Sequence, residues 1–381
     1  MTMEVAVSGF QHQVGGHFGL LQCEGHVAKP LDARELAFYK QMAPRFRKFA
    51  PVYCGTIRVR ASAAHKNGRL RLWSEKRGSS NPCHPGPAAG SGHRDFSETS
   101  SAIIMCTLQD MAAVMFRVNE EGRVEVEEGR DAHYWAANCQ IKVVQRLLAA
   151  GSTGANFILL ENVVHGMRRP CVLDLKMGTR QHGDDAPLEK QNAQRRKCAE
   201  STSAALGVRM VGMELYEEST SSYQFVDKMQ GRRMDERHLR ACLLRFVRGA
   251  GRARTAALRA RLADLRATLA EATSYRFFSS SLLVAFDAAL PDSPIQVRMI
   301  DFAHSTFDEF EGFSDVAYTD SDEGYIKGVD SLLDLIPATD DETAFEAAIT
   351  ADTLVISDIM RQSMADCSPV VSSREASPTP P

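Results

Sequence analysis

The chain has 381 residues, of which 44% are hydrophobic and 24% are charged, with a formal net charge of -3 at pH 7. This length and apolar content can bury the core of one large domain or two coupled domains, and the small net charge gives no general attraction to nucleic acid. No apolar run is long enough to cross a bilayer, and the nine cysteines show no CxxC pair or zinc-ligand spacing. We therefore expect no membrane span, no nucleic-acid binding, and a reducing cytoplasmic or nuclear compartment.

The first part of the chain is predicted to combine short strands with two helices. The expected elements are strands within 15–29, ending at Lys29, and at 52–59, 70–73, 101–108, 113–118 and 156–163, and helices at 31–42 and 135–150. Residues 74–100 are rich in Gly, Pro and Ser, which predicts a flexible insertion that carries no chemistry. The last strand stops abruptly at Glu161 and Asn162, a pattern that suits a hinge between two lobes.

The second part is predicted to alternate strands with longer helices. The expected elements are strands at 171–175, 208–215, 223–228, 282–286 and 297–301, and helices at 188–200 and 235–273, the second broken at 249–251. Leucine stripes in the long helical region predict core packing, whereas arginines on the opposite faces, such as Arg254, are expected to be mainly solvated. Beyond Leu335 the pattern weakens, and we expect 341–381 to be a largely disordered tail.

An acidic and a basic side chain share one face of the strand that begins at Cys171. Side chains alternate along a strand, so Asp174 and Lys176 point to the same side. Gly178 permits a sharp turn that brings the following basic residues to the same neighbourhood. A kinase needs a cation for the nucleotide phosphates, acidic ligands for magnesium and a group that orients the nucleophile. The segment therefore predicts a phosphoryl-transfer centre.

A second acidic position closes the strand at 297–301. Asp301 ends an apolar run and is well placed to hold a metal ion, with a strand-end turn or helix cap as the alternative for this segment alone. Ser281 precedes another apolar strand, and a hydroxyl beside an aspartate can complete an octahedral magnesium shell. An ordinary turn is the alternative for the serine run. Together with Asp174 and Lys176, Asp301 favours the metal site.

A basic segment follows the strand that carries Asp174. Lys190 and Lys197 lie two helical turns apart on one face of the helix at 188–200. The basic side chains expected to grip several phosphates of one small molecule are Arg180, His182, Lys190, Arg196 and Lys197. A solvated charged helix is the alternative. Asp184 and Asp185 are expected to start this helix as caps rather than to bind metal.

A lysine near the N-terminus is a candidate for contacting nucleotide phosphates. Lys29 ends a predicted strand, and Glu35 on the next helix is its expected ion-pair partner, with an exposed surface lysine as the alternative. The chain has no GxxxxGK[ST] loop, and Gly15 and Gly16 alone do not establish nucleotide binding. These two glycines fit a tight hairpin turn equally well.

Taken together, these motifs resemble the inositol polyphosphate kinase family. Pro170, Asp174, Lys176 and Gly178 match its Pro-x-x-x-Asp-x-Lys-x-Gly pattern, and Ser281-Leu-Leu283 and Ile300-Asp-Phe302 match two further elements. Longer stretches resemble the inositol hexakisphosphate kinases within the family. These stretches are 12–17, 29–31, 157–162, 180–186, 201–204 and 274–277. The similarity runs from about 10 to 335, apart from the insertion.

The resemblance implies an α+β, two-lobed, protein-kinase-like fold with ATP in a cleft between the lobes. The implied divisions are an N-terminal lobe at 1–160, a hinge at 161–165, a C-terminal catalytic lobe at 166–340 and an inositol-phosphate-binding segment at 180–205. The implied roles are adenine binding by Glu161 and the backbone of Val163, nucleotide-phosphate contact by Lys29, and magnesium binding by Asp301 with Ser281. Asp174 would orient or deprotonate the acceptor, and Lys176 would bridge the transferring phosphoryl group and the substrate.

The implied reaction transfers the γ-phosphoryl group of ATP to a phosphate of inositol hexakisphosphate, giving a diphosphoinositol. Inositol pentakisphosphate is a further candidate acceptor, and a monomer is expected. The alternative within the family is a multikinase that phosphorylates ring hydroxyls of less phosphorylated inositols, against which the segment 180–186 argues. A catalytically silent scaffold is the alternative outside enzymes, and the intact Asp174, Lys176 and Asp301 argue against it.

Overall fold

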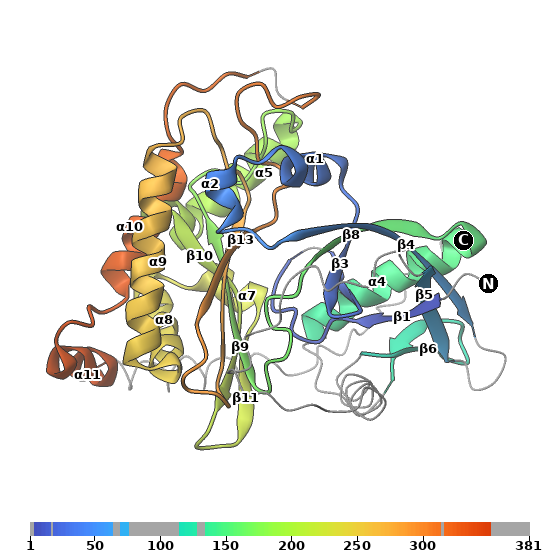
Figure 1. Cartoon of the computed structure of the whole chain (residues 1–381), viewed down its shortest axis with the longest axis horizontal. Helices are drawn as coiled ribbons and strands as arrows, with labels where there is room; N and C mark the ends of the chain where they lie inside the picture. Colours follow the sequence, from blue (N-terminus) through green and yellow to red (C-terminus); the bar gives the residue numbers. More distant parts are fainter. Residues whose placement is uncertain are drawn as a thin grey trace, which may run out of the picture.

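The computed structural model describes residues 4–16, 18–63, 69–75, 114–127, 134–313 and 316–351. These residues form two lobes, with a small β-rich lobe on the right of Figure 1 and a larger mixed lobe on the left. The fold therefore has the two-lobed α+β architecture that the sequence predicts. Within the described ranges, no helix is both long and apolar enough to cross a membrane.

The smaller lobe is a closed antiparallel barrel with the strand order β1-β2-β3-β8-β4-β5. Its strands are β1 (Glu4–Gly9), β2 (Leu21–Cys23), β3 (His26–Pro30), β4 (Tyr53–Ala63), β5 (Leu70–Glu75) and β8 (Ala155–Glu161). Side chains alternate between buried and exposed along β4 and β5, as expected when one face of a strand packs on a core. Helix α4 (Tyr134–Ala150) and the ribbon of β6 (Phe116–Val118) and β7 (Val124–Val126) add side chains to this core.

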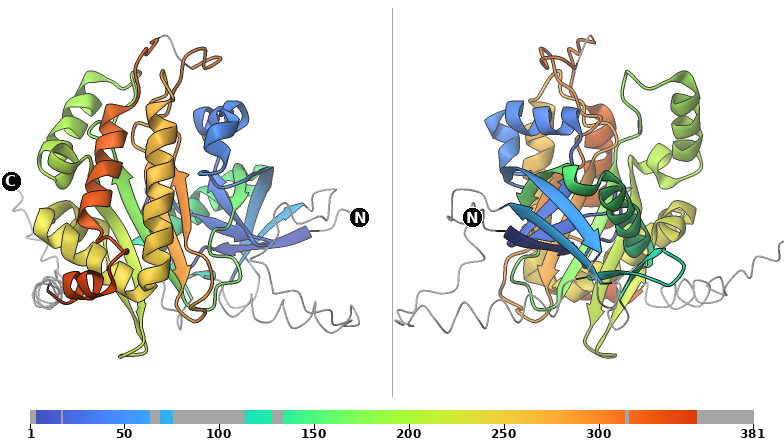
Figure 2. Two further views of the ribbon diagram at one scale, coloured as in Figure 1. Left: turned by 60° about the vertical axis from the view of Figure 1, so that its left-hand side comes forward. Right: turned by 90° about the vertical axis from the view of Figure 1, so that its right-hand side faces the viewer.

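The larger lobe is built on a five-stranded antiparallel sheet with the order β11-β10-β9-β12-β13. Its strands are β9 (Pro170–Met177), β10 (Val208–Glu217), β11 (Ser222–Val226), β12 (Ser281–Asp287) and β13 (Gln296–Ile300). The helices of this lobe are α5 (Leu188–Ala199), α6 (Thr202–Leu206), α7 (Lys228–Arg233), α8 (Glu236–Ala250), α9 (Arg252–Ala270), α10 (Glu323–Leu335) and α11 (Glu342–Ala351). Helices α9 and α10 run side by side along the sheet (Figure 2, left).

Helices α8 and α9 pack on the sheet through stripes of leucine side chains. Leu239, Leu243, Leu258 and Leu262 are almost fully buried in the main core, which confirms the packing predicted from their spacing. The prediction for Arg254 was wrong, because its guanidinium is buried and donates to the backbone oxygens of the loop after β12. A buried arginine needs such acceptors to offset the loss of water.

The helices that follow β3 join the core of the larger lobe. These are α1 (Ala33–Gln41) and α2 (Pro44–Arg47). Phe38 of α1 stacks on Phe302 with ring centroids 4.8 Å apart, and the backbone N–H of Met299 donates to Phe49 O at 2.5 Å. This packing anchors α1 beside the end of β13, where Asp301 lies.

Several predicted boundaries differ from the structure. The segment 341–381 begins with α11, whose Phe345 and Ile349 are buried, so its first ten residues are ordered rather than disordered. Ser74, placed in the insertion, is a buried residue of β5, and Lys228, placed at the end of a strand, opens α7. Gly15 and Gly16 lie in the loop between β1 and β2, while the turn between β2 and β3 is made at 24–25. Residues 76–100 of the insertion and the strand expected at 101–108 lie outside the described residues.

Candidate active site

A cleft between the lobes has an apolar end and a charged end. Its apolar wall is made by Val27, Leu160, Val164, Val172 and Leu283. Its charged wall is made by Lys29, Asp174, Lys176, Asp301 and His304. Glu161 and Val163, from the connection that joins β8 to β9, close the apolar end. This arrangement places a flat apolar slot next to groups that can handle phosphate.

The side chain of Glu161 is engaged within the protein. Its carboxylate accepts a hydrogen bond from Val52 N at 3.1 Å and another from Arg298 Nη2 at 3.4 Å. Its backbone N–H donates to Val52 O at 2.9 Å. The acid therefore fixes the start of the connection between the lobes, and its carboxylate is not the group turned toward a ligand.

A buried lysine links both lobes at the charged end. Lys29 Nζ lies 2.8 Å from the Glu35 carboxylate and 2.6 Å from Asp301 Oδ1, which confirms the predicted Lys29–Glu35 pair. Burial by itself would lower the pKa of Lys29, but Asp301 and Glu35 raise it above its usual value, so the ammonium stays charged. The Glu35 carboxylate also accepts from Phe302 N at 3.0 Å, which ties α1 to the residue after Asp301.

The side chain of Asp174, on β9, is buried close to two cations, Lys176 and Arg209. Burial, followed by repulsion from Asp301, raises the pKa of Asp174 to about 6, while Lys176 and a hydrogen bond from Ser281 act in the opposite direction. Among the described residues, Asp174 Oδ1 is buried without a hydrogen-bond partner. Such an orphaned acceptor costs stability unless a ligand, ion or water completes it.

Lys176 projects from the same face of β9, as the strand alternation predicts. Its ammonium donates to Ser279 O, and burial lowers the pKa of Lys176 although Asp301 and Asp174 oppose that effect. In the sheet, Lys176 is paired with Arg209 of β10 on one side and with Ser281 of β12 on the other. A lysine in this position can approach a phosphate without large rearrangement.

Three further cations that the sequence analysis missed lie near Asp174 and Lys176. Arg209 of β10 and Lys228 and Arg232 of α7 repel one another electrostatically in this region. Arg209 is 9% exposed, and within the described chain neither its Nη1 nor Arg232 Nε has a hydrogen-bond partner. The available signal was an arginine inside the otherwise apolar run of β10. Guanidinium nitrogens that lack acceptors close to other cations indicate a site for a strongly anionic ligand.

The two residues predicted to bind metal differ in exposure and in their contacts. Asp301 faces the cleft with a partly exposed side chain, whereas Ser281 is buried and its hydroxyl is bonded to Asp174. The described residues contain no group of three or more His, Cys, Asp or Glu side chains that could hold a metal ion by themselves. A metal here would need oxygen ligands from a substrate, as is usual for magnesium in kinases.

Comparison with known proteins now places the chain. A sequence model described as inositol polyphosphate kinase matches residues 157–337. Inositol hexakisphosphate kinase 3 of Mus musculus is 33% identical, over 87% of this chain and 94% of its own length. The chain belongs to the inositol polyphosphate kinase family. It is accordingly a phosphotransferase, which confirms the expected enzyme class.

A second relative gives the same result. Inositol hexakisphosphate kinase 1 of Rattus norvegicus is 31% identical, over 89% of this chain and 94% of its own length. The chain is also similar to the solved inositol phosphate multikinase Ipk2 of S. cerevisiae, in complex with ADP and Mn2+, with 25% identity, a TM-score of 0.41, and coverage of 48% of this chain and 83% of that chain.

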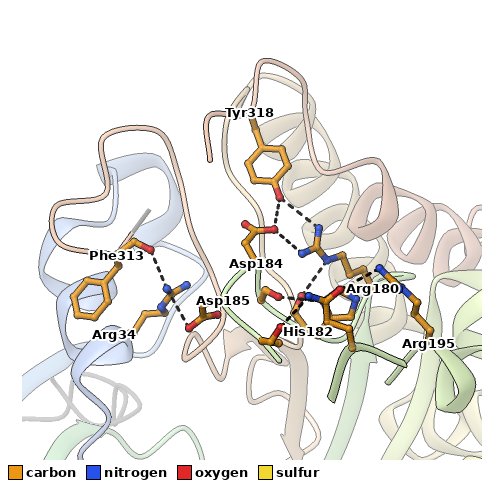
Figure 3. Close-up of polar contacts among 11 residues, drawn as sticks. Arg34, Arg180, His182, Asp184, Asp185, Arg195, Phe313 and Tyr318 are labelled. Carbon is orange, nitrogen blue, oxygen red and sulfur yellow. Dashed lines mark hydrogen bonds and ion pairs between the residues drawn. The ribbon is translucent and has the colours of Figure 1, made fainter. Parts of the chain in front are cut away.

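The segment after β9 does not enter the cleft in the predicted way. Arg180 donates to Asp184 Oδ1 at 2.5 Å and to His182 O at 3.1 Å, and its guanidinium lies 4.1 Å from the ring centroid of Phe278. Tyr318 also donates to Asp184 Oδ1, at 2.8 Å, so these side chains converge on one carboxylate (Figure 3). His182 is buried with Nδ1 against Gly183 O. Arg180 and His182 therefore shape this segment and border a separate hollow with Arg195.

The two acids of this segment are not helix caps, so that prediction was wrong. Helix α5 begins after Pro187, and among the described residues no side chain caps it. Asp184 holds Arg180, while Asp185 pairs with Arg34 of α1 at 3.5 Å (Figure 3). Arg34 also donates to Phe313 O at 2.8 Å. Through Arg34, Asp185 thus connects this segment both to α1 and to the chain at Phe313.

The basic residues of α5 differ in their distance from the cleft. Lys190 Nζ lies 3.5 Å from His304 Nε2, and His304 lines the charged wall. Burial, followed by Lys190, lowers the pKa of His304. Arg196 and Lys197 are exposed in the last turn of the helix. Only Lys190 of the three is thus tied to a residue of the cleft, and its role in binding stays a prediction.

Proposed function

We propose that this protein transfers the γ-phosphoryl group of ATP to a phosphate of inositol hexakisphosphate and so forms a diphosphoinositol. The observation that carries the proposal is the group of four basic side chains near Asp174, namely Lys176, Arg209, Lys228 and Arg232, of which Arg209 and Lys228 are buried and two keep unpartnered guanidinium nitrogens within the described chain. A ligand with many phosphates offsets their mutual repulsion. The relatives that align with most of this chain are named as kinases of the same acceptor, inositol hexakisphosphate.

The nucleotide is assigned to the cleft between the lobes. Its apolar slot, bounded by Val27, Leu160 and Leu283, suits a flat base, and the backbone at Glu161 and Val163 supplies hydrogen-bonding groups at the edge of the slot. Lys29 sits at the opposite end, where the phosphates would extend. Its pairing with Glu35 holds the ammonium in a fixed position.

The residues present fit a divalent cation. Asp174 and Asp301 repel each other across the charged end, and Asp174 Oδ1 is an orphaned acceptor within the described residues. We assign Asp301 as the residue that would hold Mg2+, with Asp174 nearby and Ser281 supporting Asp174 rather than the metal. In this position the ion would supply positive charge to neutralise the charge that develops during transfer.

The chain's own contribution to catalysis is positioning and charge neutralisation. An acceptor phosphate is already largely ionised near neutral pH, so Asp174 orients it more than it removes a proton. Lys176 lies on the same strand face and would contact both the acceptor and the transferred group. Arg209 and Lys228 would hold neighbouring phosphates of the ring. Fixed cations in a water-poor site stabilise charge more strongly than solvated ones.

The outer substrate contacts form a further part of the proposal. Lys190 is proposed to reach the acceptor through its position beside His304, and Arg196 and Lys197 are proposed as exposed cations that attract it. Arg180 and His182 border the hollow with Arg195, and their role as substrate contacts stays a prediction. Inositol pentakisphosphate as a second acceptor, a monomeric state, and a cytoplasmic or nuclear location stay predictions.

The proposal is tested by turnover of the purified protein with ATP, Mg2+ and either inositol hexakisphosphate or inositol trisphosphate. We expect consumption of ATP that depends on the hexakisphosphate. Lys176→Ala is expected to abolish it with an unchanged circular dichroism spectrum, which separates an enzyme from a scaffold. Efficient use of the trisphosphate with the hexakisphosphate untouched would show a multikinase, and full activity of Lys176→Ala would refute the mechanism.

A further inference from the structure

The loop between β1 and β2 crosses from the small lobe onto the sheet of the large lobe. Its ends are held together, because Phe10 N donates to Leu20 O at 3.0 Å. Inside the loop, the Gln13 amide donates to Gly15 O and Phe18 O, and its oxygen accepts from Leu20 N at 2.9 Å. Loops closed at their ends and filled by their own side chains behave as compact units. This β1–β2 loop can therefore be positioned as a whole from a few points.

The loop lies in very close contact with the strands that carry the reacting groups. A Cβ added to Gly15 would lie 2.4 Å from Asp174 Oδ2, and one added to Gly212 of β10 would lie 2.0 Å from Val14 O. Lys228 Nζ, one of the cations assigned to the acceptor, is 3.5 Å from Gly16 O. Only glycine allows backbones to approach this closely. The loop thus borders both Asp174 and the cation cluster.

One side-chain pair fastens the loop to the large lobe. His12 Nδ1 lies 3.1 Å and 3.2 Å from the two carboxylate oxygens of Glu214, a residue 202 positions later in the chain. Glu214 is buried on β10, between Val172 of β9 and Phe225 of β11, so it cannot follow a displaced loop. A hydrogen bond to a buried carboxylate is among the stronger ones in proteins.

We propose that His12 is a positioning residue whose hydrogen bond to Glu214 fixes the β1–β2 loop on the large lobe and so holds Gly15 against Asp174 and Gly16 against Lys228. The histidine itself does not touch the reacting atoms. Without the bond, the loop loses its side-chain hydrogen bond to β10, and the geometry around Asp174 loosens. The expected loss is both in the rate of the bound complex and in nucleotide affinity, because Phe10, Val14 and Leu20 of the loop also line the apolar part of the cleft.

Because Nδ1 is the histidine nitrogen that contacts Glu214, variants of His12 can be chosen that keep or lose this hydrogen bond. In histidine, Nδ1 is two bonds from Cβ, and the amide nitrogen of asparagine is equally far, whereas that of glutamine is one bond farther. His12→Asn should therefore keep the bond to Glu214, and His12→Ala and His12→Gln should lose it. His238→Ala is the matched control, because it removes a histidine–carboxylate pair with Asp235 on the exposed surface of α8.

Two measurements test the proposal. Hydrogen exchange of the ligand-free protein, read on peptides that cover 10–20, should rise in His12→Ala and His12→Gln and stay unchanged in His12→Asn and His238→Ala. This arm does not depend on the proposed function. In kinetics, which rest on that function, kcat should fall about tenfold in His12→Ala and His12→Gln, equivalent to about 1.4 kcal/mol. The KM for ATP should rise in the same two variants, and His12→Asn should recover most of both kcat and KM.

Each outcome decides the matter. If His12→Ala does not fold, His12→Gln carries both measurements. Equal exchange in His12→Asn and His12→Gln would overturn the role of the Glu214 bond, whatever the acceptor of the enzyme proves to be. Altered exchange with unchanged kcat per folded molecule would show a purely structural pair. Absence of hexakisphosphate turnover in the wild-type protein with the expected exchange pattern would refute the proposed function and keep the loop attachment.

Discussion

Lys29 Nζ on β3 and Asp301 Oδ1 after β13 lie 2.6 Å apart although 272 residues separate them in the chain. Glu35 on α1 completes the contact at 2.8 Å from the same ammonium. These three charges join both lobes at the charged end of the cleft. A buried pair of this kind is destabilising when one member is left alone, because the remaining charge keeps its desolvation cost.

Replacing Lys29 is therefore expected to affect stability and activity separately. Lys29→Met should reduce turnover at least about 100-fold and destabilise the protein by roughly 3–5 kcal/mol, since Glu35 becomes a buried acid without its cation. The double variant Lys29→Met with Glu35→Gln should recover most of the stability but none of the activity. Urea unfolding and ATP turnover measure the two effects. Recovery of activity in the double variant would contradict the role of Lys29.

The buried carboxyl of Asp174 is expected to lower the free energy of unfolding at neutral pH. Native Asp174 has a pKa raised to about 6 by burial and by Asp301, against 3.8 ordinarily. As the pH rises from 3.8 to about 6, the Asp174 carboxyl therefore loses its proton in the unfolded chain before it does so in the native state. Over this interval the free energy of unfolding falls by up to about 3 kcal/mol. Asp174→Asn should be more stable than wild type above pH 6 and nearly inactive.

Urea unfolding of wild type and Asp174→Asn measures this difference in unfolding free energy. The assay covers pH 4 to pH 7.5 and contains a chelator. The stability advantage of Asp174→Asn should grow with pH across the interval. An advantage that does not depend on pH would show that Asp174 titrates normally. Ser281→Ala is a useful comparison, because it removes a hydrogen bond that lowers the pKa of Asp174 and should enlarge the effect in the parent protein.

Lys228 is expected to take up a proton when the acceptor binds. Burial, Arg232, Arg209 and Lys176 lower its pKa to about 7, so at pH 8 most of the native molecules hold it neutral. Bound phosphates favour the ammonium, and the affinity for the acceptor should therefore fall as the pH rises above about 7. Titration calorimetry in two buffers with different ionisation enthalpies measures the uptake. Lys228→Met should abolish it, and Lys327→Met, at an exposed position of α10, should not.

The adjacent acids Asp184 and Asp185 should differ in their importance. Asp184 accepts from Arg180 and Tyr318, and its loss should cost about 2 kcal/mol of unfolding free energy. Asp185 is 62% exposed and pairs with Arg34 at 3.5 Å, so Asp185→Ala should cost less than about 1 kcal/mol. Thermal unfolding of Asp184→Ala and Asp185→Ala compares them directly. Equal losses would contradict the central role of Asp184 in holding this segment.

The part of the site that follows from local rules was predictable. Strand alternation placed Asp174 and Lys176 on one face, and the apolar run before Asp301 placed that acid at a strand end. The Lys29–Glu35 pair followed from a strand joined to a helix. Each of these predictions depends on neighbours in sequence, which periodicity describes well.

The part that depends on distant contacts was not predictable from local patterns. Arg209 meets Lys228 only because β10 leads through β11 to α7, and no spacing rule contains that path. His182 is buried with its Nδ1 against Gly183 O, although the sequence alone shows an exposed basic segment. Arg254 likewise finds its acceptors in a loop more than thirty residues later, which no helical wheel reveals.

The most direct test of the proposed activity is the identity of the product made from inositol hexakisphosphate. We predict that 31P NMR of the reaction with ATP and Mg2+ shows a new diphosphate pair on the inositol, with a mass increase of one phosphoryl group, and that Asp174→Asn and Lys176→Ala yield neither signal. Unchanged inositol hexakisphosphate, together with phosphorylation of free hydroxyls on inositol trisphosphate, would contradict the account.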